Sequence, residues 1–331
     1  MTTRVVEPGL VSTIVPVHNR PLLLTDAVES VLSQSYRPLE VLIVDDGSTD
    51  ETAGVADRLA TEHAREVQVL HVPHGGPGLA REAGRRHARG EFIQYLDSDD
   101  MLLPEKFERQ VSTLRAEPES GVCYGMTRCL DDPSPVGDRA WRRTGERIER
   151  MFPSFLVDRW WGTLTPLYRR SVTDSIGPWT GLWNEEDWEY DCRVAALGLP
   201  LSYVPHFVAE VRVHGGDRLS RGAREPAKLR DRAAAHALIL DHARRAGIGP
   251  RQEEMRHFAR ELFLLSRQCG AAGLGSEARH LHDLAVLASD GNEGRNLDLR
   301  AYGVLARVVG WDRIGSLACA LDSRRGRRRN L

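Results

Sequence analysis

The stretch VLIVDDGSTD at residues 41–50 decides the fold prediction, because an apolar run ends there in two carboxylates and a turn. A short apolar run that is bounded by turn residues is typical of a buried strand. The residues that follow, 50–63, carry apolar side chains at helical spacing, so we expect a helix after the strand. A strand followed by a crossover helix is one β-α unit of a parallel sheet.

The same alternation continues on both sides of this stretch and predicts a mainly parallel sheet that is flanked by helices, from about residue 11 to residue 213. The segment 131–147, which contains Asp-Asp-Pro-Ser-Pro and scattered charges, is expected to be a mobile loop. The other strands are expected at 11–17, 67–72 and 91–96, and the other helices at 22–34 and 78–88.

The character of the chain changes after Arg224. Ala, Leu, Arg and His residues at helical period replace the strand signal, and an arginine-rich run starts after Ser323. We therefore predict an α/β domain over 1–224, an α-helical C-terminal region over 225–322 and a basic, disordered tail over 323–331.

Composition narrows the class of protein. The chain has 331 residues, 41% hydrophobic and 28% charged, which is ordinary for a folded protein. Its 45 basic and 47 acidic residues nearly balance, so no nucleic-acid partner is expected. No apolar run approaches the roughly 18 to 20 residues of a membrane-spanning helix, and the N-terminus lacks the layout of a signal peptide, which favours a cytoplasmic protein. The five cysteines form no C-x-x-C pair and are expected to be reduced.

Two acidic clusters directly follow expected strands, at Asp45–Asp46 and at Asp97–Asp100. In an open parallel sheet, ligands bind at the carboxyl ends of the strands, so both clusters are expected to face one cleft. Asp97 and Asp99 are two residues apart in extended chain, which points both carboxylates to one side. Such a pair suits Mg²⁺ or Mn²⁺ that bridges to a diphosphate.

A glycine-rich turn at 75–81 opens the helix between these clusters. Helix N-termini favour anions, and Arg81, one turn in, is placed either to touch a phosphate or to hold an aspartate. The turn matches neither the phosphate loop of kinase-like NTPases nor the G-x-G-x-x-G of nicotinamide dehydrogenases, so both classes lose their main support.

A third acidic group, residues 184–193, begins an apolar-periodic helix. Asp187 lies near the start of this helix, where a negative charge is favourable to the helix dipole. It also lies among aromatic residues, where a carboxylate can act as a general base. The residues alone leave both interpretations open.

Taken together, five motifs in this order and spacing resemble the family 2 glycosyltransferases with the GT-A fold. The resemblance covers about residues 10–220 and implies an inverting, metal-dependent transfer of a sugar from a nucleotide-diphosphate donor, with Mg²⁺ or Mn²⁺ as the metal. The motifs are Pro16-Val17-His18-Asn19, residues 44–50, Gly75–Arg81, residues 96–100 and Glu186-Asp187.

On the donor side, the resemblance implies that Pro16 and Asn19 border the nucleoside and that Asp46 contacts the base. Arg81 would stand near the nucleotide, and Asp97 would lie near the ribose or the sugar. The expected donor is a UDP-sugar.

For the metal and the base, the resemblance implies that Asp99 is the direct metal ligand and that His214 reaches the metal or the diphosphate. Asp187 matches the catalytic base, which would deprotonate the acceptor hydroxyl. The chain departs from the family at His18, where relatives carry an aromatic residue, and at Glu82, where they commonly carry Asn.

Five tryptophans lie between residues 160 and 188. Because flat indole faces suit pyranose rings, we expect Trp183 and Trp188, next to Asp187, to line the site. Trp160, Trp161 and Trp179 are expected to pack in the core.

The acceptor is not selected by the sequence and is a glycan, a lipid-linked intermediate, a natural product or a protein side chain. Without membrane spans the chain lacks an export channel, so one sugar per encounter is expected. The arginine-rich tail is a candidate for contact with anionic lipids at the inner face of the membrane, and the C-terminal helices for a homodimer contact.

Two alternatives stay open. A sugar nucleotidyltransferase also binds nucleotides over an α/β sheet, although residues 18–21 lack the Gly-rich, Lys-bearing loop that it would need. A catalytically silent homologue would act as an assembly scaffold through its C-terminal helices.

Overall fold

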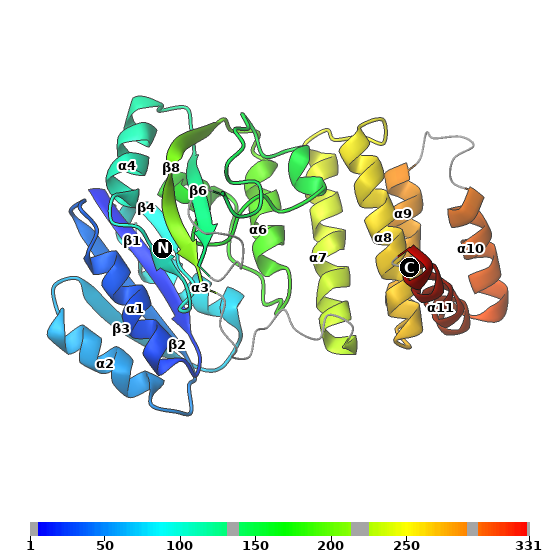
Figure 1. The fold of residues 1–331 in the computed structure, drawn as a ribbon, viewed down its shortest axis with the longest axis horizontal. Coiled ribbons are helices and arrows are strands. Elements are labelled where there is room, and N and C mark those ends of the chain that lie inside the picture. Colours follow the sequence, from blue (N-terminus) through cyan, green and yellow to red (C-terminus); the bar gives the residue numbers. More distant parts are fainter. Residues whose placement is uncertain (1–5, 131–138, 213–224, 290–296, 330–331) are drawn as a thin grey trace. The chain divides into compact units, whose positions relative to one another are not determined.

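The computed structural model describes residues 6–130, 139–212, 225–289 and 297–329. The chain divides into two compact units (Figure 1). The first unit comprises 1–150, 160–181 and 199–216, and the second comprises 151–159, 182–198 and 217–331. The expected boundary after residue 224 therefore differs from the division that the structure shows.

The first unit is built on one sheet. Within the described residues, its eight strands have the order β3-β2-β1-β4-β7-β6-β8-β5. The strands are β1 (Glu7–Val17), β2 (Leu39–Asp46), β3 (Val67–Val72), β4 (Gly90–Tyr95), β5 (Met101–Leu102), β6 (Val122–Cys129), β7 (Leu167–Arg169) and β8 (Leu201–Val211).

The sheet is mixed rather than mainly parallel throughout. Strands β1 to β4 pair in parallel, as predicted, and β6 also pairs in parallel with β8. The short strands β7 and β5 run antiparallel to their neighbours. The four strands predicted from the apolar runs are all present. Strands β1, β2 and β4 are largely buried on both faces, whereas β3, at the edge of the sheet, is only partly buried.

Helices cover both faces of this sheet (Figure 1). Apolar residues of α1, α2 and α4 share a core with Val15 and Ile43. Helix α3 packs on the other face, where a Cβ on Gly84 would lie 2.4 Å from Ile14 Cγ2, so only glycine permits this close approach. The helices of this unit are α1 (Pro21–Leu32), α2 (Thr52–Glu62), α3 (Pro77–His87), α4 (Lys106–Ala116) and α5 (Arg170–Ser175).

The second unit is helical. It consists of the short helix η1 (Ser154–Leu156), α6 (Glu186–Ala195), α7 (Pro226–Arg245), α8 (Glu253–Ala271), α9 (Gly275–Ser289), α10 (Leu297–Val309) and α11 (Trp311–Arg329). The predicted helical character after residue 224 is confirmed. However, α11 continues to Arg329, so most of the tail that we expected to be disordered lies in a helix.

Helix α6 belongs with the C-terminal helices because charged side chains join it to α7. Glu185 lies 2.9 Å from His236, and Glu189 lies 2.9 Å from His242. The buried carboxylate of Glu189 needs such a partner, and the sequence pattern of α6 alone does not reveal these contacts. The division of the chain therefore follows these contacts rather than the change in composition.

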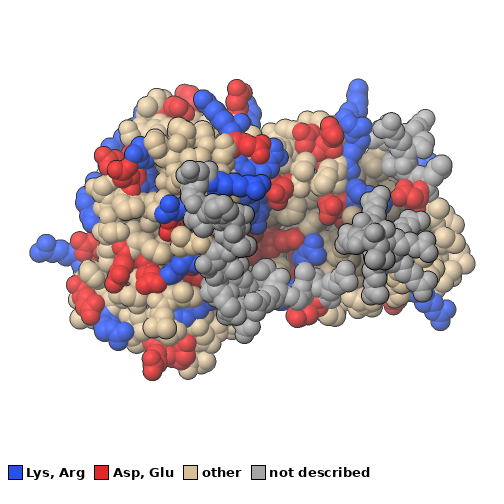
Figure 2. Space-filling view, in the orientation of Figure 1, with Lys and Arg blue, Asp and Glu red and all other residues tan. Residues whose placement is uncertain are grey.

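Three other expectations concern the chain as a whole. Of the expected loop 131–147, residues 139–147 contain no helix or strand, whereas 131–138 lie outside the described residues. All five cysteines are free thiols. In the described ranges, no helix is both long and apolar enough to cross a membrane. On the face shown in Figure 2, basic side chains are interspersed with acidic ones.

Candidate active site

Two of the acidic clusters meet at one edge of the sheet. Asp46 ends β2, and Asp97 follows closely after β4. Strands β2 and β4 pair in parallel with β1 on its two sides, with Val17 opposite Asp45 and Ile14 opposite Tyr95. The carboxyl ends of both strands therefore lie at the same edge, where ligands of open parallel sheets bind.

Asp46 anchors the glycine turn. Its Oδ1 accepts the N–H of Gly75 at 2.8 Å, and its Oδ2 accepts the N–H of Gly76 at 2.9 Å. Gly76 has φ +91°, a conformation that favours glycine. The Asp46 side chain is only 5% exposed, and both of its carboxylate oxygens bind the turn that starts α3. Contact between Asp46 and the nucleobase stays a prediction.

A stacked pair of histidines lies beside this turn. The Nδ1 atoms of His18 and His74 donate to the Asp46 carbonyl oxygen, at 2.9 and 2.8 Å. Their ring centroids are 3.9 Å apart, with 20° between the planes. His18, which replaces the aromatic residue of the family motif, thus keeps a flat ring at this edge. His74 was not predicted as a site residue, because its only signal in the sequence is its place just before the glycines.

Asn19 ties together the loops that follow β1 and β2. Its N–H donates to Ser48 Oγ at 3.0 Å, and its Oδ1 accepts the N–H of Thr49 at 2.8 Å. Asn19 has φ +53°, which asparagine tolerates better than most residues. Pro16 lies buried on β1, opposite Val44 of β2. Both residues shape the edge, and their contact with a nucleoside stays a prediction.

Arg81 holds the acidic loop rather than standing open. Its Nη2 donates to Asp97 Oδ1 at 2.6 Å, and its guanidinium lies 4.9 Å from the centroid of the Trp179 ring. Of the two expectations for Arg81, the structure therefore favours the aspartate. Trp179, expected only to pack, also positions Arg81.

Glu82 contacts the backbone of the same tryptophan. Its carboxylate accepts the N–H of Trp179 at 3.3 Å and two hydrogen bonds of 2.9 Å from Arg85. Burial favours the neutral acid, but the hydrogen bonds from Arg85 and Arg86 hold the pKa of Glu82 below its usual value. The departure from the family's Asn thus carries a structural role.

The acidic loop after β4 is held by two further arginines. Asp99 forms an ion pair with Arg20. Arg212, at the end of β8, donates its N–H to Asp100 Oδ1 at 3.2 Å and its Nε–H to the Asp99 carbonyl at 2.9 Å. Burial, followed by the charges of Asp97 and Asp99, raises the pKa of Asp100 well above its usual value. Sequence patterns did not reveal Arg20 or Arg212, since neither lies near the loop in the chain.

Asp187 lies in the second unit, at the start of α6. Arg159 pairs through Nη1 with Asp187 Oδ2 and donates from Nε to Asp191 Oδ2 at 2.7 Å. The N–H of Trp188 donates to Asp187 Oδ1 at 2.7 Å. The aromatic setting that we expected therefore includes a cation, and a neighbouring guanidinium favours an ionised carboxylate. Arg159 was not found from the sequence.

Comparison with known proteins decides the family. The model of glycosyl transferase family 2 matches residues 12–174. This part of the chain belongs to glycosyltransferase family 2. The matched residues contain the glycine turn, both acidic clusters and their arginines Arg20 and Arg81.

Several curated relatives of this glycosyltransferase domain match over 100 to 138 residues, and EpsH of Bacillus subtilis matches over 214 residues at 28% identity, 63% of this chain and 62% of EpsH. An uncharacterized glycosyltransferase of Rickettsia conorii is 33% identical over 138 residues, which is 40% of this chain and 22% of the relative. Glycosyltransferase GlyG of Streptococcus pneumoniae is 38% identical over 100 residues, 30% of this chain and 33% of GlyG. The matched stretch covers 18 to 22% of the length of the relatives from Rickettsia conorii, Rickettsia felis and Rickettsia bellii.

Solved structures show the GT-A fold. S. aureus TarS 1–349 in complex with UDP-GlcNAc matches with a TM-score of 0.67 and 18% identity, over 96% of this chain and 92% of that one. The mannosyltransferase PcManGT from Pyrobaculum calidifontis, in complex with GDP-Man and Mn²⁺, matches with a TM-score of 0.52 and 20% identity, over 94% and 86%. The predicted GT-A fold with C-terminal helices is confirmed.

The acidic loop of this family 2 domain has the chemistry for a divalent cation. Asp97 and Asp99 offer carboxylate oxygens, the ligands that Mg²⁺ and Mn²⁺ prefer, although each also contacts an arginine. In the parts of the chain that the structure describes, no group of three His, Cys, Asp or Glu side chains forms a cage. Binding of Mg²⁺ or Mn²⁺ by Asp97 and Asp99 stays a prediction. His214 lies outside the described residues.

The tryptophans divide between packing and exposure. Trp160, Trp161 and Trp179 are at most 4% exposed, which confirms that they pack. Trp183 is 36% exposed in the second unit. Trp188 is half-buried, and its Nε1–H donates to the Phe155 carbonyl at 2.8 Å. A sugar-binding role for Trp183 and Trp188 stays a prediction.

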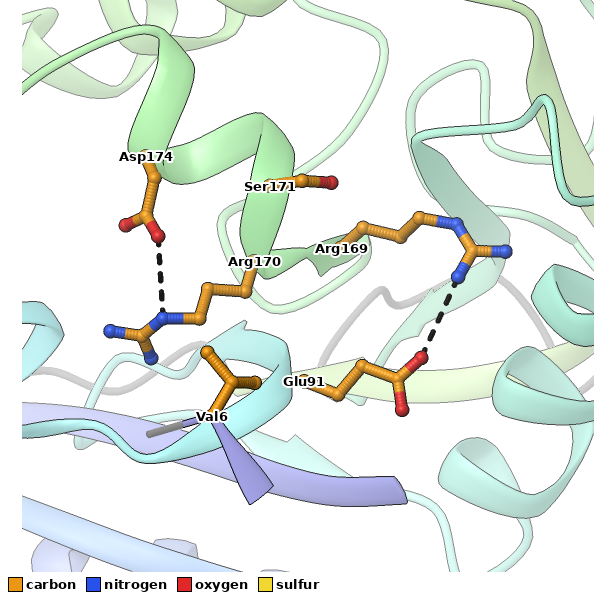
Figure 3. Close-up of a pocket in the computed structure, with 6 residues that line it drawn as sticks. All are labelled: Val6, Glu91, Arg169, Arg170, Ser171 and Asp174. Carbon is orange, nitrogen blue, oxygen red and sulfur yellow. Dashed lines mark ion pairs between the residues drawn. The ribbon is translucent and has the colours of Figure 1, made fainter. Parts of the chain in front are cut away.

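A pocket of the first unit lies at the other edge of the sheet (Figure 3). Val6 precedes β1 and Glu91 is near the start of β4, so this pocket is at the amino ends of the parallel strands. Its charges are paired, with Arg170 Nε 3.3 Å from Asp174 and Arg169 Nη1 3.8 Å from Glu91 (Figure 3). The pocket is therefore separate from the acidic edge. Its lining residues are Val6, Glu91, Arg169, Arg170, Ser171 and Asp174.

Proposed function

We propose that this chain transfers a sugar from a UDP-linked donor to an acceptor hydroxyl, with inversion at the anomeric carbon. The observation that carries the proposal is the acidic loop after β4, where Asp97 and Asp99 are held by Arg81 and Arg20 beside the turn anchored by Asp46. Carboxylates and guanidinium groups at the carboxyl ends of parallel strands suit a nucleotide diphosphate.

UDP is the proposed nucleotide. The fold match with the higher TM-score, 0.67, is to TarS in complex with UDP-GlcNAc. PcManGT, in complex with GDP-Man, matches with a TM-score of 0.52. The flat rings of His18 and His74 at the same edge support a site for a nucleobase.

The reaction needs two tasks from the protein. As the acceptor oxygen attacks the anomeric carbon, the bond to the diphosphate breaks and negative charge grows on the leaving group. Arg20 and Arg81 are cations that can exchange a carboxylate for a phosphate oxygen as this charge grows. A Mg²⁺ or Mn²⁺ ion held by Asp99, with His214 as a further ligand, would neutralise the same charge.

Asp187 is the proposed general base. Its carboxylate takes the proton of the attacking hydroxyl, and no second carboxylate is proposed as a nucleophile. One displacement without a covalent intermediate inverts the configuration, so an α-linked donor yields a β-linked product. The acceptor is proposed only as a hydroxyl group, of a glycan, a lipid-linked intermediate, a natural product or a protein.

Ligand-dependent thermal stability tests the donor side. UDP, GDP, CDP, dTDP and ADP are each added with and without Mn²⁺, and the melting temperature is measured. A ligand at about 100 times its Kd stabilises the native state by about 2.7 kcal/mol, so binding is readily seen. We expect UDP with Mn²⁺ to give the largest shift.

The control is Asp99→Asn, which should lose the part of the shift that depends on Mn²⁺ while keeping the rest. A larger shift with another diphosphate would contradict the choice of UDP. If none of the five diphosphates shifts the melting temperature, the silent scaffold becomes the better reading of this family 2 domain.

A further inference from the structure

We infer that Arg159 is a positioning residue that holds Asp187 ready to accept a proton; this rests on the proposed role of Asp187 as the base. Arg159 comes from the segment 151–159 and meets α6 at its first two turns. Asp187 and Asp191 are four residues apart on α6 and therefore share one face of the helix. Arg159 contacts both carboxylates, through Nη1 and Nε respectively.

Burial gives the two carboxylates different tasks. The side chain of Asp191 is 1% exposed and that of Arg159 is 9% exposed, whereas Asp187 is 29% exposed. A buried arginine needs a fixed anion, and Asp191 supplies it. Asp187, the more exposed of the two carboxylates, is the one proposed to react.

Both oxygens of Asp187 have a donor. Arg159 pairs with Oδ2, and the N–H of Trp188 donates to Oδ1 at 2.7 Å. Two donors on one carboxylate fix its rotation, and the guanidinium keeps it ionised. A base must be ionised and correctly oriented before it can accept a proton, so Arg159 meets both needs.

The proton balance follows from this arrangement. The hydroxyl proton passes to Asp187, the oxygen electron pair forms the new bond to the anomeric carbon, and the diphosphate leaves with the pair of the broken bond. Arg159 stays protonated throughout, because a guanidinium does not lose its proton in proteins. Without Arg159, the ionised form of Asp187 loses its neighbouring cation, so Asp187 becomes protonated at a higher pH.

Other charged groups around α6 have partners of their own. Glu185 pairs with Arg232 and His236, and Glu189 pairs with Arg193 and His242. Asp231 of α7 accepts the N–H of Trp183 at 3.0 Å. The remaining charged groups on the segment 151–159 and on the first turns of α6 are Asp158 and Glu186.

The test uses the full chain and UDP-GlcNAc as the probe, with water as acceptor, and measures UDP release from about pH 4 to pH 9. Arg159→Gln should lower kcat by about tenfold or more and leave the KM for UDP-GlcNAc within about twofold. It should also shift the acid limb of the pH–rate profile, where the rate falls because Asp187 becomes protonated, to higher pH by about 1 unit. Arg159→Lys should restore the position of the acid limb more fully than it restores kcat. Lysine supplies the positive charge but lacks the planar guanidinium that contacts both carboxylates.

The matched control is Arg193→Gln. Arg193 is 12% exposed and pairs with Glu189 on the same helix, so its loss removes an equally buried ion pair without touching the proposed base. Its acid limb should stay in place. If Arg159→Gln changes kcat no more than Arg193→Gln and leaves the limb unmoved, Arg159 is only structural and the inference is wrong.

Asp187→Asn separates this failure from failure of the proposed function. If Asp187→Asn releases UDP at the wild-type rate, the base assignment is wrong and the role of Arg159 falls with it. If only the Arg159 result fails, the base assignment stands.

If Arg159→Gln does not fold, Asp191→Asn provides the second variant, because it leaves the cation beside Asp187 and removes its anchor. It should lower kcat without moving the acid limb upward. An unchanged kcat in Asp191→Asn would overturn the anchoring.

Discussion

Arg81 donates a hydrogen bond of 2.6 Å to Asp97, and this contact joins the helix after the glycine turn to the acidic loop after β4. The Arg81 side chain is 4% exposed and lies over the ring of Trp179. Two separate β-α units are thereby locked together at the edge of the sheet where the nucleotide is proposed to bind.

Replacement of Arg81 by lysine should weaken this lock. Lysine keeps the charge but loses the planar fork and the stacking on Trp179. A loss of about 1.4 kcal/mol corresponds to about tenfold weaker affinity for UDP, measured by calorimetric titration. Arg58→Lys, at an exposed position on α2, is the control and should leave the affinity unchanged. Equal affinities for both variants would mean that Arg81 does not organise the site.

Asp99→Asn and Asp187→Asn should fail in different ways. Asp99→Asn removes the proposed metal ligand, so the gain in UDP affinity from Mn²⁺ should fall by about tenfold. Asp187→Asn should bind UDP normally but lose transfer by about 100-fold or more, because it cannot accept a proton. Titration calorimetry and UDP release measure the two effects. Normal transfer by Asp187→Asn would refute its role as the base.

The stability of the first unit should depend on pH through His71. Hydrogen bonds to Asp45 and then Asp57 raise the pKa of His71 above its ordinary value of 6.5. The folded state therefore holds this proton more tightly than the unfolded chain does. The stabilisation is complete below about pH 6.5 and is lost as the pH rises through the raised value.

His71→Gln should accordingly flatten the fall in melting temperature between about pH 6 and pH 8. His257→Gln, at an exposed position of α8, is the control. Because His71 is 48% exposed, the effect should be small but specific to this variant. An equally steep fall in both variants would contradict the prediction.

Lys106→Met should stabilise the protein at neutral pH. Lys106 is fully buried, and burial lowers its pKa to about 7. The cost of this buried amine is largest below about pH 7 and disappears as the pH rises toward 10.5, where the unfolded chain also loses the proton. In this variant the backbone carbonyl of Thr165 loses the hydrogen bond from Lys106 Nζ at 2.7 Å but keeps the one from Gln110 Nε2 at 3.2 Å.

Melting temperatures from about pH 6 to pH 10 check this prediction, since the advantage of the methionine variant should shrink as the pH rises. Lys228→Met replaces the other lysine of the sequence, which is 21% exposed, and should show no such trend. A lower melting temperature for Lys106→Met at neutral pH would contradict the prediction and show that the buried amine contributes to stability.

Glu189→Gln should destabilise the second unit by about 3 kcal/mol. Glu189 is 1% exposed and lies 2.7 Å from Arg193 and 2.9 Å from His242, so the substitution removes the buried anion that both side chains contact. Urea unfolding followed by circular dichroism measures the change. Asp241→Asn breaks the exposed pair with Arg245 and should cost less than about 1 kcal/mol. Similar costs for both variants would argue against α6 being held by α7.

Sequence patterns were sufficient for the β-α units and for the acidic edge. Apolar runs such as residues 41–44 predict their strands because burial on both faces demands such runs, and turn residues mark where the strands end. Asp46 and Asp97 were therefore located correctly at the ends of β2 and β4. These features depend on neighbours in the chain, which local periodicity records.

Only the tertiary structure decided which arginines meet which carboxylates. The pairs Arg20–Asp99 and Arg159–Asp187 join segments that are distant in sequence, and a long guanidinium side chain takes its partner from whatever elements lie beside it. The same reason explains why α6 belongs with α7 rather than with the sheet. The sequence by itself determined the β-α units and the acidic edge, whereas the division into two compact units and the charge partners of the proposed catalytic groups depended on packing in three dimensions.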